Sequence, residues 1–241
     1  MGKIHFTRWL FCSIGLASGL MFGQSPALQN PVSELRLHLV PSQAGKQQSA
    51  PAVAWLDTLA VKPDLSFTPH GRYTLLQKNR TFVPHLQIIP VGAAIQFPNS
   101  DPFFHNVFSL FNGKRFDLGL YEAGSSKSVT FSREGVSYIF CNIHPEMSAV
   151  VIALSTPLYA VADAKGAFVL SGIPAGDYSL HIWIEGVPQA ITDRLTRPVH
   201  LLGQNLDLGP ITVPVAPQGI DAHTNKFGNL YDPSAKSPYD H

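Results

Sequence analysis

The sequence predicts an all-β fold made of one β-sandwich and a second, smaller β-sandwich. Charged residues make up only 14% of the chain, whereas 19 glycines and 20 prolines supply turn formers for many short strands. Short apolar or alternating runs recur between these turns, and no segment has a sustained helical period with caps. The formal net charge of +1 is too small to indicate nucleic acid or an acidic membrane surface as a partner.

The first 27 residues are predicted to be a signal peptide that directs export to the periplasm or another compartment outside the cytoplasm. Lys3 and Arg8 form a basic start, and the apolar stretch 9–22 is followed by polar residues. Cleavage is expected between residues 23 and 27, although no A-x-A site marks it. An uncleaved anchor, and with it contact to a membrane, therefore stays open as an alternative.

The two cysteines of the chain have different expected fates. Cleavage of the signal peptide would remove Cys12 and leave Cys141 alone. A single cysteine in an exported protein cannot form an internal disulfide and, if exposed, is open to oxidation. The sequence therefore leaves two interpretations of Cys141, a metal ligand or a buried inert thiol.

Residues 28–155 are predicted to form the first sandwich. The run Leu35–Leu39 alternates apolar and polar residues with the period of a half-buried strand, and residues 52–56 form another apolar run. Turn signals at 90–92 and 98–101 separate later runs. Further strand candidates lie at 73–76, 86–89, 94–97, 106–111, 128–131, 136–140 and 149–154.

The pattern restarts after a boundary near residues 155–157, and residues 156–215 are predicted to form the smaller sandwich. The segment Asp163–Gly166 is typical of a tight turn between two strands. The strand candidates of this part are 159–162, 167–170, 178–184, 198–202 and 206–213. Residues 216–241 are polar, contain Pro and Gly, and are expected to form a surface-hugging or disordered tail.

Three side chains that bind metal ions lie within seven residues, namely Cys141, His144 and Met147. The loop that carries them joins two predicted strands, so its ends are held and the three donors could meet at one point. Donors of this kind suit copper, particularly in a site of two His, one Cys and a long axial Met. The loop supplies one His, and His105, between a turn and a strand, is the candidate for the second. Zinc is the competing metal, but structural zinc sites rarely use Met.

At these residues the chain resembles the cupredoxins, the type 1 blue copper proteins. They carry a His near the start of one strand and a Cys, a His and a Met on one later loop. The match consists of His105-Asn106-Val107 and the Cys-x2-His-x2-Met spacing of loop 141–147, which is most similar to the short loop of amicyanin. The resemblance covers about residues 32–154 and includes three shorter matches, Phe82-x-Pro84, Val91-Gly92 and Phe97-x-Asn99.

The resemblance implies a Greek-key β-sandwich and a copper ion that cycles between Cu(I) and Cu(II). Cys141 would be the equatorial thiolate, and His105 and His144 would be the two equatorial imidazoles. Met147 would be the axial thioether. Such a ligand set leaves no open position for a substrate, so the protein is expected not to be an enzyme.

The surroundings of the site are also implied by the resemblance. Asn106 would hydrogen-bond toward the Cys loop and hold the ligand geometry. His144 would lie toward the surface and conduct electrons. Phe103, Phe104 and Pro145 would flank it as an apolar patch suited to a short-lived complex with a redox partner. That partner would be an unidentified dehydrogenase or cytochrome.

The second sandwich carries a resemblance of its own. The pattern that begins at Gly166-x-Phe168-x-Leu170 and ends at Tyr178-x-Leu180 is similar to the carboxypeptidase regulatory-like domain, a transthyretin-type sandwich. This resemblance implies a fold and no activity. The two modules together are similar to proteins labelled methylamine-utilisation or plastocyanin-like.

Single-electron transfer through the four proposed ligands is the leading hypothesis from the sequence. One alternative is a periplasmic copper carrier or reservoir that uses the same ligands without redox turnover. Another is a cell-envelope binding module, which depends on the second sandwich and the low charge. Five other histidines are expected to be surface or hydrogen-bonded residues: His38, His70, His85, His181 and His200.

Overall fold

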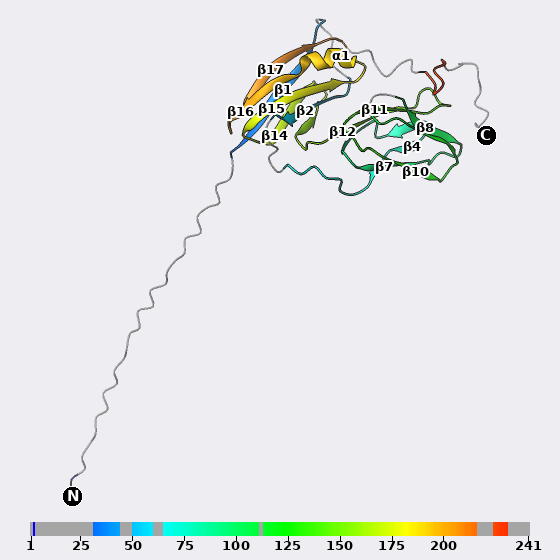
Figure 1. Ribbon diagram of the computed structural model, residues 1–241, viewed down its shortest axis with the longest axis horizontal. Coiled ribbons are helices and arrows are strands. Elements are labelled where there is room, and N and C mark those ends of the chain that lie inside the picture. Colours follow the sequence, from blue (N-terminus) through cyan, green and yellow to red (C-terminus); the bar gives the residue numbers. More distant parts are fainter. Residues whose placement is uncertain are drawn as a thin grey trace.

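A computed structural model describes residue 2 and residues 31–43, 50–59, 65–110, 113–215 and 224–230. Its regular structure is almost entirely β, which confirms the predicted fold class (Figure 1). The exceptions are a short helix, α1 (Gln189–Thr192), and a 3-10 turn, η1 (Asp193–Leu195). In the described ranges no helix is long and apolar enough to cross a membrane. The predicted signal peptide at 1–27 lies outside the described residues apart from residue 2.

One sandwich, here called the site sandwich, is built from residues 73–154. Its smaller sheet has the order β10-β7-β3, and its larger sheet has the order β6-β12-β11-β8-β9. The strands of the smaller sheet are β3 (Tyr73–Thr74), β7 (Ala94–Pro98) and β10 (Ser126–Thr130). Those of the larger sheet are β6 (Leu86–Pro90), β8 (His105–Ser109), β9 (Phe116–Tyr121), β11 (Gly135–Phe140) and β12 (Ser148–Leu154). A hairpin of β4 (Leu76–Lys78) and β5 (Thr81–Val83) completes it.

The core of the site sandwich follows from the period-2 pattern of its strands. Alternate residues of β7, Ile95 and Phe97, are fully buried, while their neighbours face solvent. They pack in one cluster with Phe131, Ile139 and Val151. Cys141 and Met147 belong to this same cluster, so the predicted metal loop is continuous with the core.

The second sandwich faces a three-stranded sheet, β14-β1-β17, with a four-stranded sheet, β13-β2-β15-β16. Its strands are β1 (Val32–Pro41), β2 (Ala52–Thr58), β13 (Tyr159–Val161), β14 (Ala167–Pro174), β15 (Gly176–Ile184), β16 (Arg197–Leu201) and β17 (Leu206–Val213). The predicted tight turn joins β13 to β14. There Gly166 has a φ of 78°, and its N–H donates to the Asp163 carbonyl over 2.9 Å.

The strand pairing corrects the predicted division into 28–155 and 156–215. Strands β1 and β2, assigned to the first sandwich by the sequence, belong to the second. Strand β1 lies between β14 and β17, and β2 lies between β13 and β15, so each sheet would be cut in two without them. Leu35, Leu37 and Leu39 point into the core of the second sandwich. The cupredoxin-like pattern is therefore confined to the chain after β2.

The two sandwiches pack against each other through their outer sheet faces (Figure 1). Val150, Ile152 and Leu154 of β12 meet Val53 of β2 and Trp183 of β15 in one buried cluster. The other face of β12 lies in the core of the site sandwich. Because both faces are covered, the strand is a continuous apolar run with no polar alternation.

Polar contacts also cross this junction. The indole N–H of Trp183 donates to the hydroxyl of Tyr138 over 3.2 Å. The Nε2 atom of His85, beside β6, lies 2.7 Å from the buried carboxylate of Glu185 at the end of β15. Its Nδ1 atom lies 3.1 Å from the carbonyl oxygen of Ser148. His85 therefore links the two sandwiches.

Candidate metal centre

The loop 141–147 is held closed at its base. Strands β11 and β12 are antiparallel neighbours whose last pair is Phe140 with Ser148. Inside the loop, the N–H of Cys141 donates to the Met147 carbonyl over 3.3 Å, and the N–H of Met147 donates to the His144 carbonyl over 3.1 Å. These bonds fix the backbone at each of the three predicted ligands.

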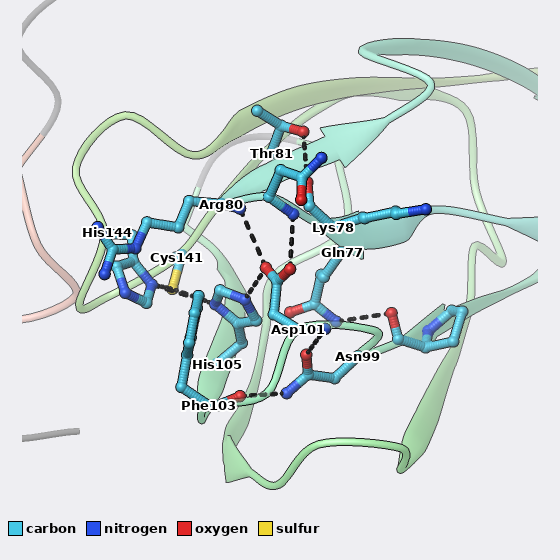
Figure 2. A network of polar contacts seen from close by, with 12 residues as sticks. Gln77, Lys78, Arg80, Thr81, Asn99, Asp101, Phe103, His105, Cys141 and His144 are labelled. Atoms are coloured by element: carbon cyan, nitrogen blue, oxygen red, sulfur yellow. Dashed lines mark hydrogen bonds and ion pairs between the residues drawn. The ribbon is translucent and has the colours of Figure 1, made fainter. Parts of the chain in front are cut away.

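His105 reaches the same place from the neighbouring strand. It is the first residue of β8, which pairs with β11 through Phe108 and Phe140. The Cys141 sulfur lies 3.8 Å from His105 Nδ1 and 3.6 Å from His144 Nδ1, and the two Nδ1 atoms are 3.1 Å apart. The structure thus brings three of the four predicted ligands into one buried group (Figure 2).

Met147, the fourth predicted ligand, is fully buried in the same core cluster as Cys141. The backbone bond between these two residues holds Met147 at the base of the loop. A buried Met beside a Cys also fits the simpler role of core filler, so its position agrees with either interpretation.

His144 is buried, which contradicts the expectation that it lies toward the surface. Only 3% of its surface is exposed. The Phe103 ring lies 5.5 Å from the His144 ring and 5.2 Å from the His105 ring, and the Arg80 guanidinium lies 5.1 Å above Phe103. The position of Phe103 beside His144 agrees with the sequence-based prediction, whereas Arg80 comes from a distant turn that the sequence did not connect with the site. Of the predicted apolar patch, Phe104 is 41% exposed.

Asp101 positions His105, a role that its place in a turn signal of the sequence does not reveal. Its carboxylate accepts from His105 Nε2 over 2.8 Å, and from the N–H groups of Asn79 and Arg80 over 2.6 Å and 3.0 Å (Figure 2). Burial raises the pKa of Asp101, but the Arg80, His105 and Asn79 hydrogen bonds outweigh it and hold that pKa below its usual value. The carboxylate is therefore ionised.

The ionised carboxylate selects the tautomer of His105. Burial lowers the pKa of His105 despite the opposing effect of Asp101, so the ring is neutral at neutral pH. The Nε2 atom, which faces Asp101, carries the proton, and Nδ1 keeps its lone pair toward Cys141 and His144. A carboxylate that orients a histidine in this way is characteristic of metal ligands in proteins.

The turn that contacts Asp101 is unusual. Asn79 and Arg80 connect β4 to β5, and both have a φ of 54°. Two residues in this left-handed region are required by a tight hairpin turn, but the conformation costs about 1–2 kcal/mol for a residue such as Arg. The two hydrogen bonds to Asp101 offset that cost and place Arg80 over Phe103.

The Cys141 thiol is protonated at neutral pH in the absence of a metal. Burial raises its pKa more than the N–H groups of Asn106, Ile143 and His144 lower it. Those N–H groups nevertheless point at the sulfur and would stabilise a thiolate once a cation is bound. Binding of a metal ion would therefore release a proton.

Asn106 contacts the Cys loop through its backbone. The N–H group donates to Cys141, whereas the side-chain amide donates to Asp117 Oδ1 over 2.7 Å. The predicted hydrogen bond toward the loop is therefore present, but it comes from the main chain. The side chain anchors β8 to β9 instead.

The other described histidines lie away from the group. His85 bridges to Glu185, and His70 contacts Thr68. His181 stacks on Trp55 at 5.3 Å, and His200 pairs with Asp177. These contacts are consistent with the expectation of hydrogen-bonded or surface residues.

The chain matches no protein-family model and no curated protein sequence. Among solved structures it is similar to a purple cupredoxin from Nitrosopumilus maritimus, with 24% identity, a TM-score of 0.31, and coverage of 34% of this chain and 99% of that one. A mutant of amicyanin in its reduced Cu(I) form at pH 4 has 18% identity and a TM-score of 0.33, with 36% of this chain and 86% of that one covered.

A copper-containing nitrite reductase from Thermus scotoductus SA-01 is also similar. It has 19% identity and a TM-score of 0.34. The match covers 49% of this chain but only 28% of the reductase.

Proposed function

We propose that this protein is an exported copper protein that transfers single electrons. His105 and His144 would bind the ion through Nδ1, Cys141 through its thiolate, and Met147 through its thioether. The observation that carries the proposal is the convergence of three donor atoms, each within 4.8 Å of the others, at one buried point.

The donor separations fit a single small ion. Imidazole nitrogens at about 2.0 Å and a thiolate at about 2.3 Å from one ion, at angles of roughly 100–120°, are about 3.1–3.5 Å and 3.3–3.7 Å apart. The observed separations of 3.1 Å, 3.6 Å and 3.8 Å lie in or beside these ranges. The residues present therefore suit a bound metal without a large rearrangement.

The donor types favour copper over zinc. A thiolate, two imidazoles and a thioether form the set that copper electron-transfer sites use, whereas structural zinc sites rarely include Met. Copper would supply a one-electron couple between Cu(I) and Cu(II). The chain's own residues would hold the ligands in place: Asp101 orients His105, and the closed loop 141–147 orients the other three.

An electron from an external partner would have to cross the side chains that cover His144. Phe103 and Arg80 separate His144 from solvent, and the exposed Phe104 beside them would contact a dehydrogenase or cytochrome. A small apolar contact is typical of short-lived redox complexes. The second sandwich would support the site through the packing of β2 and β15 against β12.

The test is the absorption spectrum of the copper-loaded protein. We expect an intense thiolate-to-copper band in the visible range. It should be absent in Cys141→Ser and present in the matched control His200→Ala, whose histidine lies in the second sandwich. A copper-loaded protein without this band, or a Cys141→Ser variant that keeps it, would refute the proposal. Fractionation of the producing cells tests export separately.

One observation favours a second candidate function, a copper reservoir. Burial of His144 to 3% exposure lengthens the path to a redox partner and slows ligand exchange. Rapid and reversible reduction of the bound copper by a small cytochrome would support electron transfer. Slow reduction together with delivery of copper to an acceptor would support the reservoir instead.

A further inference from the structure

The chain segment 224–230, part of the predicted polar tail, is folded against the metal centre's loop. It forms a closed turn: the N–H of Asn225 donates to the Asn229 carbonyl over 2.8 Å, and the N–H of Gly228 donates to the Asn225 carbonyl over 2.9 Å. The Asn225 side chain accepts from the N–H groups of Phe227 and Asn229 over 3.0 Å and 3.1 Å. This self-bonded turn presents Lys226 to the site sandwich.

Lys226 makes two contacts with the site sandwich. Its backbone N–H donates to Asn142 Oδ1 over 3.0 Å. Its ammonium group lies 2.8 Å from Asp117 Oδ2. Asn142 directly follows Cys141 in the loop, whereas Asp117 lies in β9. One tail residue therefore touches both the ligand loop and β9, the strand that pairs with β8.

The Asp117 carboxylate extends this link to the first histidine. It accepts from the Asn106 side chain over 2.7 Å and from the Gly119 N–H over 2.9 Å. Burial raises the pKa of Asp117, but Lys226, Gly119 and Asn106 outweigh it and hold that pKa below its usual value. Asn106 follows His105 and donates its backbone N–H to Cys141. Lys226 is thus linked to the metal centre in two ways, through Asn142 beside Cys141 and through Asp117 and Asn106 beside His105.

We propose that the segment 224–230 is a clamp and that Lys226 is a positioning residue for the metal centre. The clamp holds Asn142, and with it the Cys141 end of the loop, against β8 and β9. It does so without touching a metal ligand. Its effect on the loop is independent of the bound metal, while its effect on copper retention rests on the proposed function.

The clamp can be tested by hydrogen exchange in the metal-free protein. A truncation after residue 215 removes the clamp, whereas a matched truncation after residue 230 keeps it. We expect the first to speed amide exchange in the loop 141–147 by about 5–30-fold, because a partly buried hydrogen bond and an ion pair are lost together. The second should leave exchange unchanged. Lys226→Met, which removes only the ammonium group, should give about a 1.5- to 5-fold increase that shrinks at high salt.

Copper retention supplies the second readout. Transfer of Cu(I) from the protein to excess chelator should accelerate in the truncation after 215 and in Lys226→Met. Lys165→Met, an exposed lysine in the turn between β13 and β14, is the control and should not change it. Unchanged loop exchange after removal of residues 216–241 would overturn the clamp. If the loop responds but the wild-type protein shows no thiolate-to-copper band, the clamp stands and the proposed function fails.

Discussion

Replacement of Asp101 by Asn tests how the first histidine is held. The carboxylate accepts three donors, from Asn79, Arg80 and His105, at 2.6–3.0 Å. An amide of the same shape has one acceptor oxygen, and its NH2 group must face at least one of those donors. Asp101→Asn therefore loses at least one charge-assisted hydrogen bond and weakens the remaining ones.

The size of the effect follows from these contacts. A hydrogen bond to a charged group contributes about 1.5–3 kcal/mol, so we expect the free energy of unfolding of the metal-free protein to fall by about 2–3 kcal/mol. Substitution of a residue that orients a metal ligand typically lowers metal affinity by about 10–100-fold. The same loss of Cu(I) affinity is expected here, because His105 would no longer be fixed with Nδ1 free.

Two measurements check this prediction. Urea unfolding of the metal-free variant gives the stability loss, and competition with a chelator gives the Cu(I) affinity. Asp163→Asn is the matched control, because Asp163 also accepts two backbone N–H groups, from Lys165 and Ala167, but hydrogen-bonds to no histidine of the described ranges. It should lose less stability and keep full affinity. A Cu(I) affinity of Asp101→Asn within twofold of wild type would refute the assigned role of Asp101.

Three further predictions concern the junction and the bound metal. The hydrogen bond to Glu185 raises the pKa of His85 against the effect of burial. The pair therefore stabilises the folded protein fully below about pH 6.5, and this stabilisation is lost as the pH rises through the raised pKa of His85. Glu185→Gln should abolish that pH dependence, which is on the order of 1 kcal/mol or less for a half-exposed histidine, and NMR titration should show a lower His85 pKa. Trp183→Ala should lower the unfolding free energy by about 3–5 kcal/mol by opening a cavity in the junction, whereas Trp183→Phe should lose less; equal losses in urea unfolding would contradict this. Cu(I) at 100 times its Kd should stabilise the wild-type protein by about 2.7 kcal/mol in thermal unfolding, and equal stabilisation of Cys141→Ser would count against the assigned thiolate.

Most strands could be predicted because the information that determines them is local. Alternation in Leu35–Leu39 and the apolar run of β12 are visible in a window of a few residues. The partners of β1 and β2 could not be predicted, since Leu35 pairs with Leu170 and Leu206, far along the chain. A period-2 pattern reveals which face of a strand is buried but not which sheet it joins.

The same distinction applies to the metal centre. Cys141, His144 and Met147 are recognisable by their spacing, and His105 by its place between a turn and a strand. The role of Asp101 could not be predicted, because Asp is common in turns for local reasons and its presence there does not indicate a contact with a histidine. The position of Arg80 over Phe103 and the contact of Lys226 with Asn142 depend on segments brought together only by folding.

The pairing of β1 and β2 has a consequence for the order in which the protein folds. Their partners, β13 to β17, begin at residue 159, after the whole site sandwich has been synthesised. The site sandwich occupies one continuous stretch, so it can fold while β1 and β2 still have unpaired edges. For the second sandwich to form, β1 and β2 must pair with strands on the far side of the complete site sandwich in the sequence, which is a slow, non-local step. We therefore expect the four predicted ligands to come together in a folded site sandwich before β1 and β2 pair with β13 to β17.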